Sequence, residues 1–317
     1  MDQDWWRTVQ SDDVEQHARH LGQFHWRYDQ LSGGAFRAQL AELAMPRVRV
    51  FREHTSHSTE QSGSLPAGSI GVGLALLEDN PLWMNGMRIA GDRIIVSHDS
   101  GVELCTSPDC ELGFVVADAA VMEEILQRTG ARMAANLVGK ASVTQLPKSS
   151  ERALRQLLSL VHGNFGVAPD SLQSENARRL LEDQFMLELV DALTAATVLP
   201  EECNALLRKR VVDRARERMR ENPDRPMSIL EVCNRVGASR RKLEYCFQEV
   251  LGTTPVAYMR AIRLNGVRRE LLRAQEGERI YDIAVRWGFW HFSQFSADYK
   301  RQFGELPSHT LLRSKGA

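Results

Sequence analysis

The first 130 residues show the apolar spacing of β-strands more than that of helices. Apolar and polar residues alternate in RVRVFREHTS, where Val48 and Val50 fall on one face of an extended chain. Short apolar runs bounded by Gly, Pro, Ser or Asp form SIGVGLALL (69–77) and ELGFVVAD (111–118). The segment 119–130 has helical character and stops at Gly130, a residue favoured at helix C-termini. This pattern predicts a small β domain with flanking helices.

Two segments further along have apolar residues spaced for one face of a helix, 149–165 and 175–196. The apolar positions are Leu154, Leu157, Leu158 and Val161 in the first and Leu180, Leu181, Phe185 and Leu189 in the second. We expect these helices to pack on each other, or on a second copy of the chain in a homodimer. The stretch around Pro200 is the expected hinge to the last third.

The last third of the chain contains an internal repeat. A shift of 51 positions carries Val232, Cys233, Val236 and Gly237 onto Ile283, Ala284, Trp287 and Gly288. A shift of 52 positions carries Leu243, Phe247, Leu251, Gly252 and Pro255 onto Phe295, Tyr299, Phe303, Gly304 and Pro307. The repeat predicts two copies of one helix-turn-helix unit, over about 228–251 and 280–303.

Each copy has the local signals that such a unit requires. Ser228 and Glu231 fit a capping box at the first helix, and Gly237 and Gly288 suit the left-handed backbone at its end. Apolar residues at every fourth position of each second helix predict one buried stripe, which leaves the opposite face for a partner. The segment from Pro255 to about 274 is expected to be one helix that joins the copies.

The outer face of the second helix differs between the copies. In the first copy it carries Arg240, Arg241, Lys242, Glu244 and Tyr245. Three cations in the first turn of a helix oppose its macrodipole, so an external anion is expected to compensate them. Phosphates and base edges in the DNA major groove are the obvious candidates, and an ordinary basic surface turn is the alternative.

The second copy presents fewer cations on this face. Its candidate DNA contacts are His291, Ser293, Gln294, Ala297, Lys300 and Arg301. Gln294 suits adenine, Ser293 suits several bases, and Lys300 and Arg301 suit phosphates. Trp290 and Phe292 fit a core or staple role better than base reading.

The charge is distributed unevenly along the chain. Residues 205–317 hold 23 Lys and Arg against 13 Asp and Glu, which leaves 17 against 28 for residues 1–204 of a chain with 40 and 41 in all. A basic last third beside an acidic remainder suggests that the last third meets a polyanion, although a solvated charged face would look the same.

The paired motifs resemble those of AraC/XylS-type transcription regulators. The resemblance covers roughly Met227–Ser308, with Gly288, Phe289, Phe303, Gly304 and Pro307 on the family's signature. It implies an all-α DNA-binding domain of two units. The family's base-contacting positions fall on Arg241, Glu244, Tyr245, Ser293, Gln294 and Ala297 in this sequence. Many members have a long polar side chain where this chain has Ala297.

Within that family, YDQLSGGAFRAQLAEL, VRVFREHTS and WGFWHFSQFSADY look most like the regulators of ethanolamine utilisation operons. This second resemblance implies an activator that responds to ethanolamine, adenosylcobalamin or both. Related regulators sense other metabolites.

Several other classes of protein find no support. No apolar stretch approaches the roughly 18 residues of a membrane helix, and no signal peptide begins the sequence, so we expect a cytoplasmic location. The five cysteines include no C-x-x-C pair. His54 and His57, three apart on an expected strand, would face opposite ways rather than share a metal. No Walker, H-E-x-x-H or G-x-S-x-G motif is present, so we expect no enzyme, catalytic residue or metal site.

Together these patterns predict an α+β protein of three parts. They are a β-rich ligand-sensing domain (1–148), a helical linker that could dimerise (149–204) and an AraC-type DNA-binding domain (205–317). We expect a sequence-specific activator of a catabolic operon, with double-stranded DNA, RNA polymerase and a small-molecule effector as partners. Arg52, Glu53 and Trp83 are the candidate effector contacts, unless they simply face solvent. A ligand-independent or architectural DNA-binding protein is the alternative.

Overall fold

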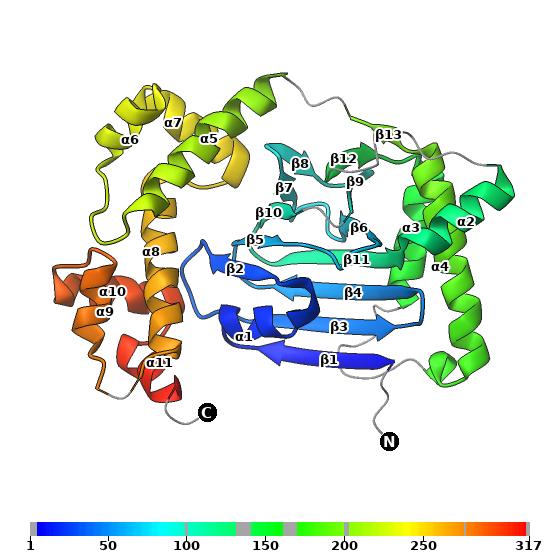
Figure 1. Cartoon of the computed structure of the whole chain (residues 1–317), viewed down its shortest axis with the longest axis horizontal. Coiled ribbons are helices and arrows are strands. Elements are labelled where there is room, and N and C mark those ends of the chain that lie inside the picture. Colours follow the sequence, from blue (N-terminus) through cyan, green and yellow to red (C-terminus); the bar gives the residue numbers. More distant parts are fainter. Residues whose placement is uncertain are drawn as a thin grey trace.

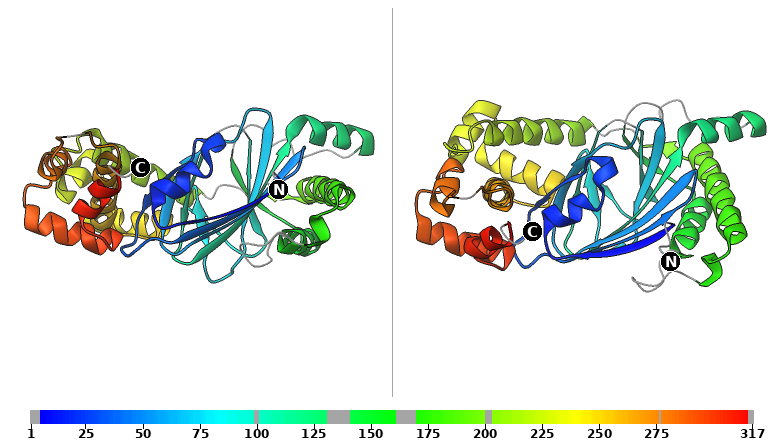
Figure 2. Two further views of the ribbon diagram at one scale, coloured as in Figure 1. Left: turned by 90° about the horizontal axis from the view of Figure 1, so that it is seen from below. Right: turned by 60° about the horizontal axis from the view of Figure 1, so that its bottom comes forward.

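The computed structural model describes residues 5–98, 101–130, 141–160, 170–199, 203–275 and 277–314. It confirms the predicted α+β class, with a β-rich half first and a helical half last (Figure 1). Figure 2 shows the helical half against one end of the β-rich half, with helices α3 and α4 at the other end. Val161 and Pro200, named above as a face residue and a hinge, lie outside the described residues.

Two antiparallel sheets form the β-rich half, in the strand orders β1-β3-β4-β11-β6-β9-β12-β13 and β2-β5-β10-β7-β8. The larger sheet consists of β1 (Trp6–Ser11), β3 (Ala38–Ala44), β4 (Val48–Thr55), β6 (Ser69–Ala75), β9 (Arg93–Ser97), β11 (Cys110–Asp118), β12 (Ser142–Gln145) and β13 (Thr197–Val198). The smaller sheet consists of β2 (Arg27–Gln30), β5 (Thr59–Gly63), β7 (Leu82–Met84), β8 (Met87–Ile89) and β10 (Val102–Thr106). Register pairs Val50 with Val115 and Val115 with Val72, so these valines share one face of the larger sheet.

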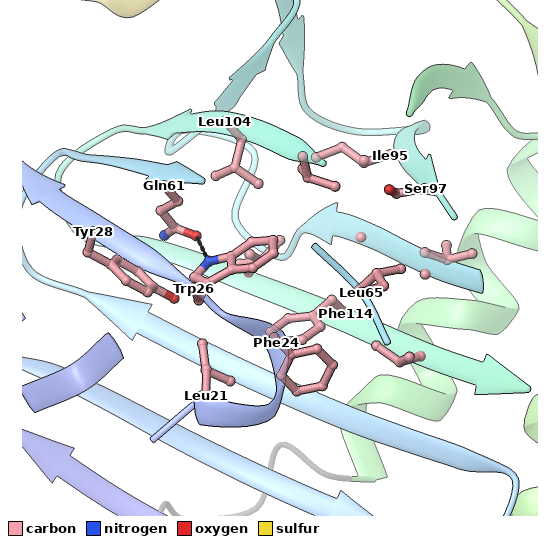
Figure 3. Close-up of a pocket in the computed structure, with 16 residues that line it drawn as sticks. Leu21, Phe24, Trp26, Tyr28, Gln61, Leu65, Ile95, Ser97, Leu104 and Phe114 are labelled. Atoms are coloured by element: carbon pink, nitrogen blue, oxygen red, sulfur yellow. Dashed lines mark hydrogen bonds between the residues drawn. The ribbon is translucent and has the colours of Figure 1, made fainter. Parts of the chain in front are cut away.

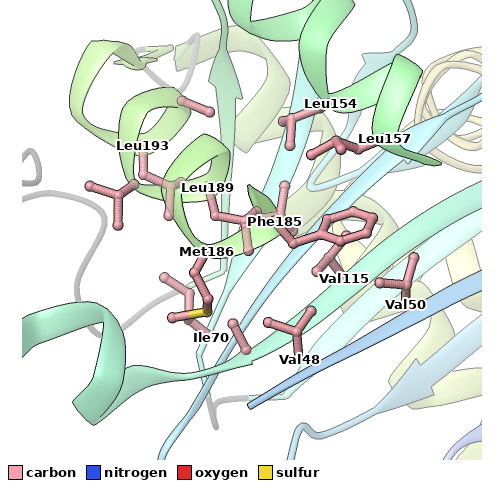
Figure 4. Close-up of a cluster of buried hydrophobic side chains, with 14 of the residues drawn as sticks. Val48, Val50, Ile70, Val115, Leu154, Leu157, Phe185, Met186, Leu189 and Leu193 are labelled. Atoms are coloured by element: carbon pink, nitrogen blue, oxygen red, sulfur yellow. The ribbon is translucent and has the colours of Figure 1, made fainter. Parts of the chain in front are cut away.

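Helices cover that valine-rich face. The helices of this half are α1 (Val14–Arg19), η1 (Gly22–Phe24), α2 (Ala119–Thr129), α3 (Lys148–Leu160), η3 (Asp170–Leu172) and α4 (Glu175–Ala195). Phe185 and Leu189 of α4 lie over Val50 and Val115, and α3 packs beside α4 (Figure 4). Helices α3 and α4 and strand β13 therefore pack as part of the β-rich half.

One residue of the predicted stripe on α4 does not lie in the core. Leu180 is 71% exposed, whereas Leu181, Phe185 and Leu189 are buried. Successive residues of a helix are rotated by about 100°, so a stripe that begins at Leu181 turns Leu180 toward solvent. The prediction that placed Leu180 on the buried face was wrong.

The helical half contains two small cores that share one helix. Its helices are α5 (Cys203–Glu221), α6 (Ile229–Val236), α7 (Arg240–Leu251), α8 (Pro255–Leu272), α9 (Ile280–Arg286), α10 (Phe292–Phe303) and α11 (Pro307–Ser314). Tyr258 and Ile262 of α8 pack in the first core, and Leu264 and Leu271 pack in the second. Helix α8 thus joins the two units, as the sequence predicted. Among the described residues, no helix is long and apolar enough to cross a membrane.

The two halves meet where α8 lies along β2, an edge strand of the smaller sheet. The Asn265 side chain accepts from the Gln30 backbone N–H at 3.0 Å and donates to the Gln30 carbonyl at 2.9 Å. The Gln302 side chain donates to the same carbonyl at 2.8 Å. The helical half therefore satisfies backbone groups that an edge strand would otherwise leave open.

Buried charges surround this contact, with acids on the β-rich half and arginines on the helical half. Glu60 accepts from Arg216, from Arg220 at 3.1 Å and from the Tyr258 hydroxyl at 2.9 Å. The other pairs join Arg268 to Asp13 at 2.5 Å, Arg269 to Asp29 at 2.6 Å and Arg269 to Glu15 at 3.2 Å. Part of the basic charge of the last third is thus neutralised within the protein.

Replacement of Glu60 should destabilise the folded chain. Glu60→Gln leaves the buried Arg216 without its main counter-charge, so we expect a loss of about 3–5 kcal/mol in the free energy of unfolding, measured by urea denaturation. Glu123→Gln on the exposed side of α2 is the matched control. A loss for Glu60→Gln within about 0.5 kcal/mol of the control would show that the pairing adds little.

Candidate nucleic-acid interface

The first helix-turn-helix unit forms from the local signals identified in the sequence. Ser228 and Glu231 make the predicted capping box, with the Ser228 N–H donating to the Glu231 carboxylate at 2.7 Å. This hydrogen bond lowers the pKa of Glu231. Gly237 ends α6 at φ 69°, a left-handed conformation that glycine adopts without a side-chain clash. Helix α7 then begins after Ser239, whose hydroxyl accepts from the Lys242 N–H at 3.2 Å.

Helix α7 buries one face and exposes the other. Leu243, Phe247 and Leu251 are buried, as the fourfold spacing predicted. The exposed residues include every predicted contact in this unit, namely Arg240, Arg241, Lys242, Glu244 and Tyr245. Arg240 pairs with Glu244 at 3.0 Å, while Arg241 and Lys242 form no ion pair with any described residue. The first turn therefore keeps uncompensated positive charge at the positive end of the helix dipole, which suits a phosphate or a base edge.

The second unit repeats this arrangement with a longer turn. Helix α9 ends at Arg286, and the chain turns through Gly288 at φ 71° before α10. A Cβ at Gly288 would lie 2.5 Å from the Pro226 ring, so the close approach also requires glycine. The predicted contacts of this unit are all exposed, namely His291, Ser293, Gln294, Ala297, Lys300 and Arg301.

A residue that the sequence reasoning missed organises the polar side chains of α10. Asp298 is buried and accepts from Gln294 at 3.0 Å and from Arg301. Arg260 of α8 lies 3.7 Å from the same carboxylate. The spacing i, i+4 from Gln294 and i, i+3 to Arg301 was visible in the sequence and could have suggested these pairs.

The aromatic residues at the start of α10 are not in the core. Trp290 is 59% exposed and Phe292 is 41% exposed, so the prediction of a core or staple role was wrong for Trp290 and only partly right for Phe292. The Phe292 ring contacts Tyr281 and Phe295, with centroids 6.1 and 5.7 Å apart. The core stripe of α10 is filled by Phe295, Tyr299 and Phe303, which leaves these two rings at its edge.

The β-rich half contacts the far ends of both second helices rather than their first turns. Gly252, directly after α7, lies beside the Trp83 ring of β7. Gly304, directly after α10, lies against Ala35, and the Gln302 carbonyl accepts from the Gly34 N–H at 3.0 Å. The predicted contact residues of both units thus remain exposed with the β-rich half in place.

A cavity lies between the two sheets (Figure 3). About 50 Å³ of it admits the centre of a water molecule. Its walls are largely apolar, with Phe24, Trp26, Leu104 and Phe114 among them. Gln61 contributes a polar group and accepts from the Trp26 indole N–H at 3.2 Å.

Only one of the three candidate effector contacts lies next to this cavity. Glu53 is buried and accepts from Gln61 at 3.0 Å, from Tyr28, and is 2.8 Å from His17. Burial would raise the pKa of Glu53, but the hydrogen bonds from these groups outweigh it and hold the pKa below its ordinary value.

The other two candidates have structural partners elsewhere. Arg52 is on the opposite face of β4 and pairs with Glu111 at 2.9 Å. Trp83 packs against the first core of the helical half. Among the described residues, no group of three or more His, Cys, Asp or Glu is placed to hold a metal ion.

Most of the helical half is similar to a known family of domains. A family model described as a helix-turn-helix domain matches residues 232–313. The chain is 38% identical over 102 residues to the probable thc operon regulatory protein of Rhodococcus erythropolis, which covers 32% of this chain and 31% of that protein. It is 23% identical over 252 residues to the XylDLEGF operon transcriptional activator 3 of Pseudomonas putida, which covers 76% of this chain and 72% of that protein.

Solved structures are similar either to about a third of this chain or to most of it. A transcriptional regulator with an AraC-type DNA-binding domain from Chromobacterium violaceum is 32% identical over 33% of this chain and 91% of its own, with a TM-score of 0.31. The AraC-like transcriptional activator CuxR is 14% identical over 89% of this chain and 99% of its own, with a TM-score of 0.46. Residues 232–313 thus form a helix-turn-helix domain, and this part of the chain is similar to part of a protein named as a probable operon regulator.

Proposed function

We propose that this chain is a sequence-specific, effector-responsive activator of a catabolic operon. The observation that carries the proposal is the pair of recognition helices, α7 and α10, whose first turns are exposed while their apolar stripes pack in separate cores. Relatives named as operon regulators and operon activators support the regulatory role and the sign of the response. RNA polymerase is the partner that activation implies.

Arg241 and Arg301 should contribute to DNA binding in different ways. Arg241→Ala should weaken binding to the selected site by about 1–3 kcal/mol and relax one base preference, because it removes a groove-reading guanidinium. Arg301→Ala should weaken binding to all sequences alike and reduce the salt dependence, because it removes a phosphate contact. Fluorescence anisotropy on selected and random duplexes at several salt concentrations measures both effects.

Arg128→Ala, on an exposed side of α2 in the β-rich half, is the control and should bind as the wild type does. Equal losses for Arg241→Ala on selected and random DNA would contradict its role in base reading. If the Kd of the wild type for DNA did not depend on salt concentration, DNA would be excluded as the partner of the helical half.

The spacing of the two units predicts an asymmetric site with two boxes. The 18 residues of α8 span about 27 Å at 1.5 Å per residue, which is near the roughly 34 Å of one turn of B-DNA. Two boxes about 10 bp apart should therefore be bound together, and insertion of about 5 bp between them should reduce the affinity to that of one box. An unchanged affinity after the insertion would mean that only one unit engages DNA at a time.

The effector is proposed to bind in the cavity between the sheets, because the smaller sheet separates this cavity from the helical half. Tyr28, Gln61 and Leu104 are register partners that line the cavity. Their neighbours in the next row, Asp29, Glu60 and Cys105, face the helical half, where Glu60 pairs with Arg216. A ligand that displaces the first row therefore acts directly on the second.

The apolar walls favour a small, largely apolar effector. Ethanolamine, which the second resemblance implied, would need its ammonium group to reach Glu53 behind Gln61. Adenosylcobalamin is far larger than this cavity and would require a different surface. A small apolar compound fits the cavity walls, ethanolamine needs access to Glu53, and adenosylcobalamin needs another surface.

Thermal unfolding with each candidate tests the effector site. We expect a small aromatic compound such as indole to raise the unfolding midpoint, since binding at a hundredfold excess over Kd stabilises by about 2.7 kcal/mol. Ethanolamine, with and without adenosylcobalamin, is the second arm. Gly73→Leu places a side chain in the cavity, where a Cβ would make only ordinary contacts at 3.8 Å, and should abolish the shift.

The DNA affinity of Gly73→Leu without ligand should equal that of the wild type. A shift that persists in this variant would place the ligand elsewhere. If no compound changes either stability or DNA affinity, DNA binding is ligand-independent, which is the alternative function.

A homodimer through α4 is part of the proposal. Leu180 and Leu187 lie seven residues apart on the outer side of this helix and are 71% and 52% exposed. Seven residues are close to two helical turns, so both leucines fall on one exposed face.

A further inference from the structure

The exposed face of the second unit carries apolar side chains beside its polar ones. Trp290, Phe292 and Ala297 are exposed along the first turns of α10 and the turn before it. The corresponding positions of α7, 52 residues earlier, carry Arg240 in place of Phe292 and Tyr245 in place of Ala297. The two units share one fold but offer different chemistry to the major groove.

Two polar side chains of α10 are already engaged within the protein. The Gln294 amide donates to Asp298 at 3.0 Å, and Arg301 donates to the same buried carboxylate. An adenine contact through Gln294 would have to break or share this hydrogen bond, because such a contact uses both ends of the amide. The exposed apolar side chains are therefore available for base contact, together with Ser293.

Neighbouring rings hold Phe292, and also Phe289, which directly precedes Trp290. The Phe292 ring lies between Tyr281 of α9 and Phe295 in the second core. The Phe289 ring, one residue before Trp290, contacts Phe295 with centroids 5.2 Å apart. Rings fixed in this way lose little conformational freedom when a partner covers them.

The location of these rings selects the partner. They lie at the N-terminal end of a recognition helix, which is the part that enters the major groove in helix-turn-helix proteins. Lys300 and Arg301 further along α10 supply positive charge for the adjacent phosphates. The apolar group that DNA presents in this groove is the C5-methyl of thymine.

We propose that the second unit recognises its half of the DNA site by apolar contact of Trp290, Phe292 and Ala297 with thymine methyl groups. The first unit reads hydrogen-bonding base edges, so the two boxes differ in the kind of contact as well as in sequence. The proposal rests on the proposed sequence-specific binding of two boxes.

Substitution of thymine by deoxyuridine tests the proposal, because it removes only the methyl group and keeps the base pair. Each thymine of a selected site is replaced singly, and the Kd of the full-length chain is measured by fluorescence anisotropy at constant salt. Loss of one buried methyl should weaken binding about three- to fivefold at one or more positions of the second box.

The protein variants assign this effect to the aromatic side chains. Trp290→Ala and Phe292→Ala should each bind the thymine site more weakly and lose the difference between thymine and deoxyuridine. Phe292→Leu, which keeps an apolar side chain next to the second core, should retain part of the difference. Arg241→Ala should keep the whole difference, because it changes only the first unit. Circular dichroism of each variant verifies that the fold is intact.

Three outcomes overturn the proposal. Equal Kd values for thymine and deoxyuridine at every position would exclude methyl recognition, while sequence-specific binding itself would stand. A Trp290→Ala variant that loses the same affinity for both kinds of site would assign Trp290 to the sugar-phosphate backbone. If both aromatic variants bind DNA as the wild type does but fail to activate transcription in vitro, the aromatic face belongs to a protein partner.

Discussion

The contact between the acidic β-rich half and the basic helical half is the interaction on which the rest of this structure depends. Asp13, Asp29 and Glu60 are buried carboxylates, and each is paired with an arginine from the other half. A buried charge without its partner costs several kcal/mol. Separation of the two halves would break these ion pairs and would have to transfer the charged groups to water. The pairs therefore set how the β-rich half and the helical half are oriented.

Hydrogen bonds to the backbone make this orientation specific. Asn265 of α8 pairs with both the N–H and the carbonyl of Gln30, as a neighbouring strand would. An amide side chain satisfies both groups only at one position along the strand, so α8 cannot slide along β2. Because α8 also contributes to the cores of both helix-turn-helix units, the edge of one sheet holds the helix that joins the two DNA-binding units.

The alternation of side chains across a β-strand places the cavity and the contact with the helical half on opposite faces of one sheet. Gln61 faces the cavity and Glu60 faces Arg216, although the two are neighbours in the chain. The cavity wall is thus one peptide unit from the ion pairs that orient the helical half. The first turns of α7 and α10 stay exposed in this arrangement.

The sequence by itself determined the elements that depend on local signals. Capping residues, left-handed glycines and apolar stripes repeat with the period of each element, so the two helix-turn-helix units, the joining helix α8 and the β character of the first half could be predicted from it. The identity of the exposed residues on α7 and α10 also followed, because a buried stripe defines its opposite face.

Only the tertiary structure decided which groups meet across the fold. The Glu53 cluster, the cavity and the pairing of Glu60 with Arg216 join residues up to 156 positions apart, and no local periodicity encodes such contacts. The exposure of Leu180 and Trp290 was decided in the same way, since whether an apolar side chain is buried depends on what packs against it. The excess of arginine in the last third shows the difference most clearly: the sequence located the charge, and the fold divided it between the β-rich half and the exposed face of the recognition helices.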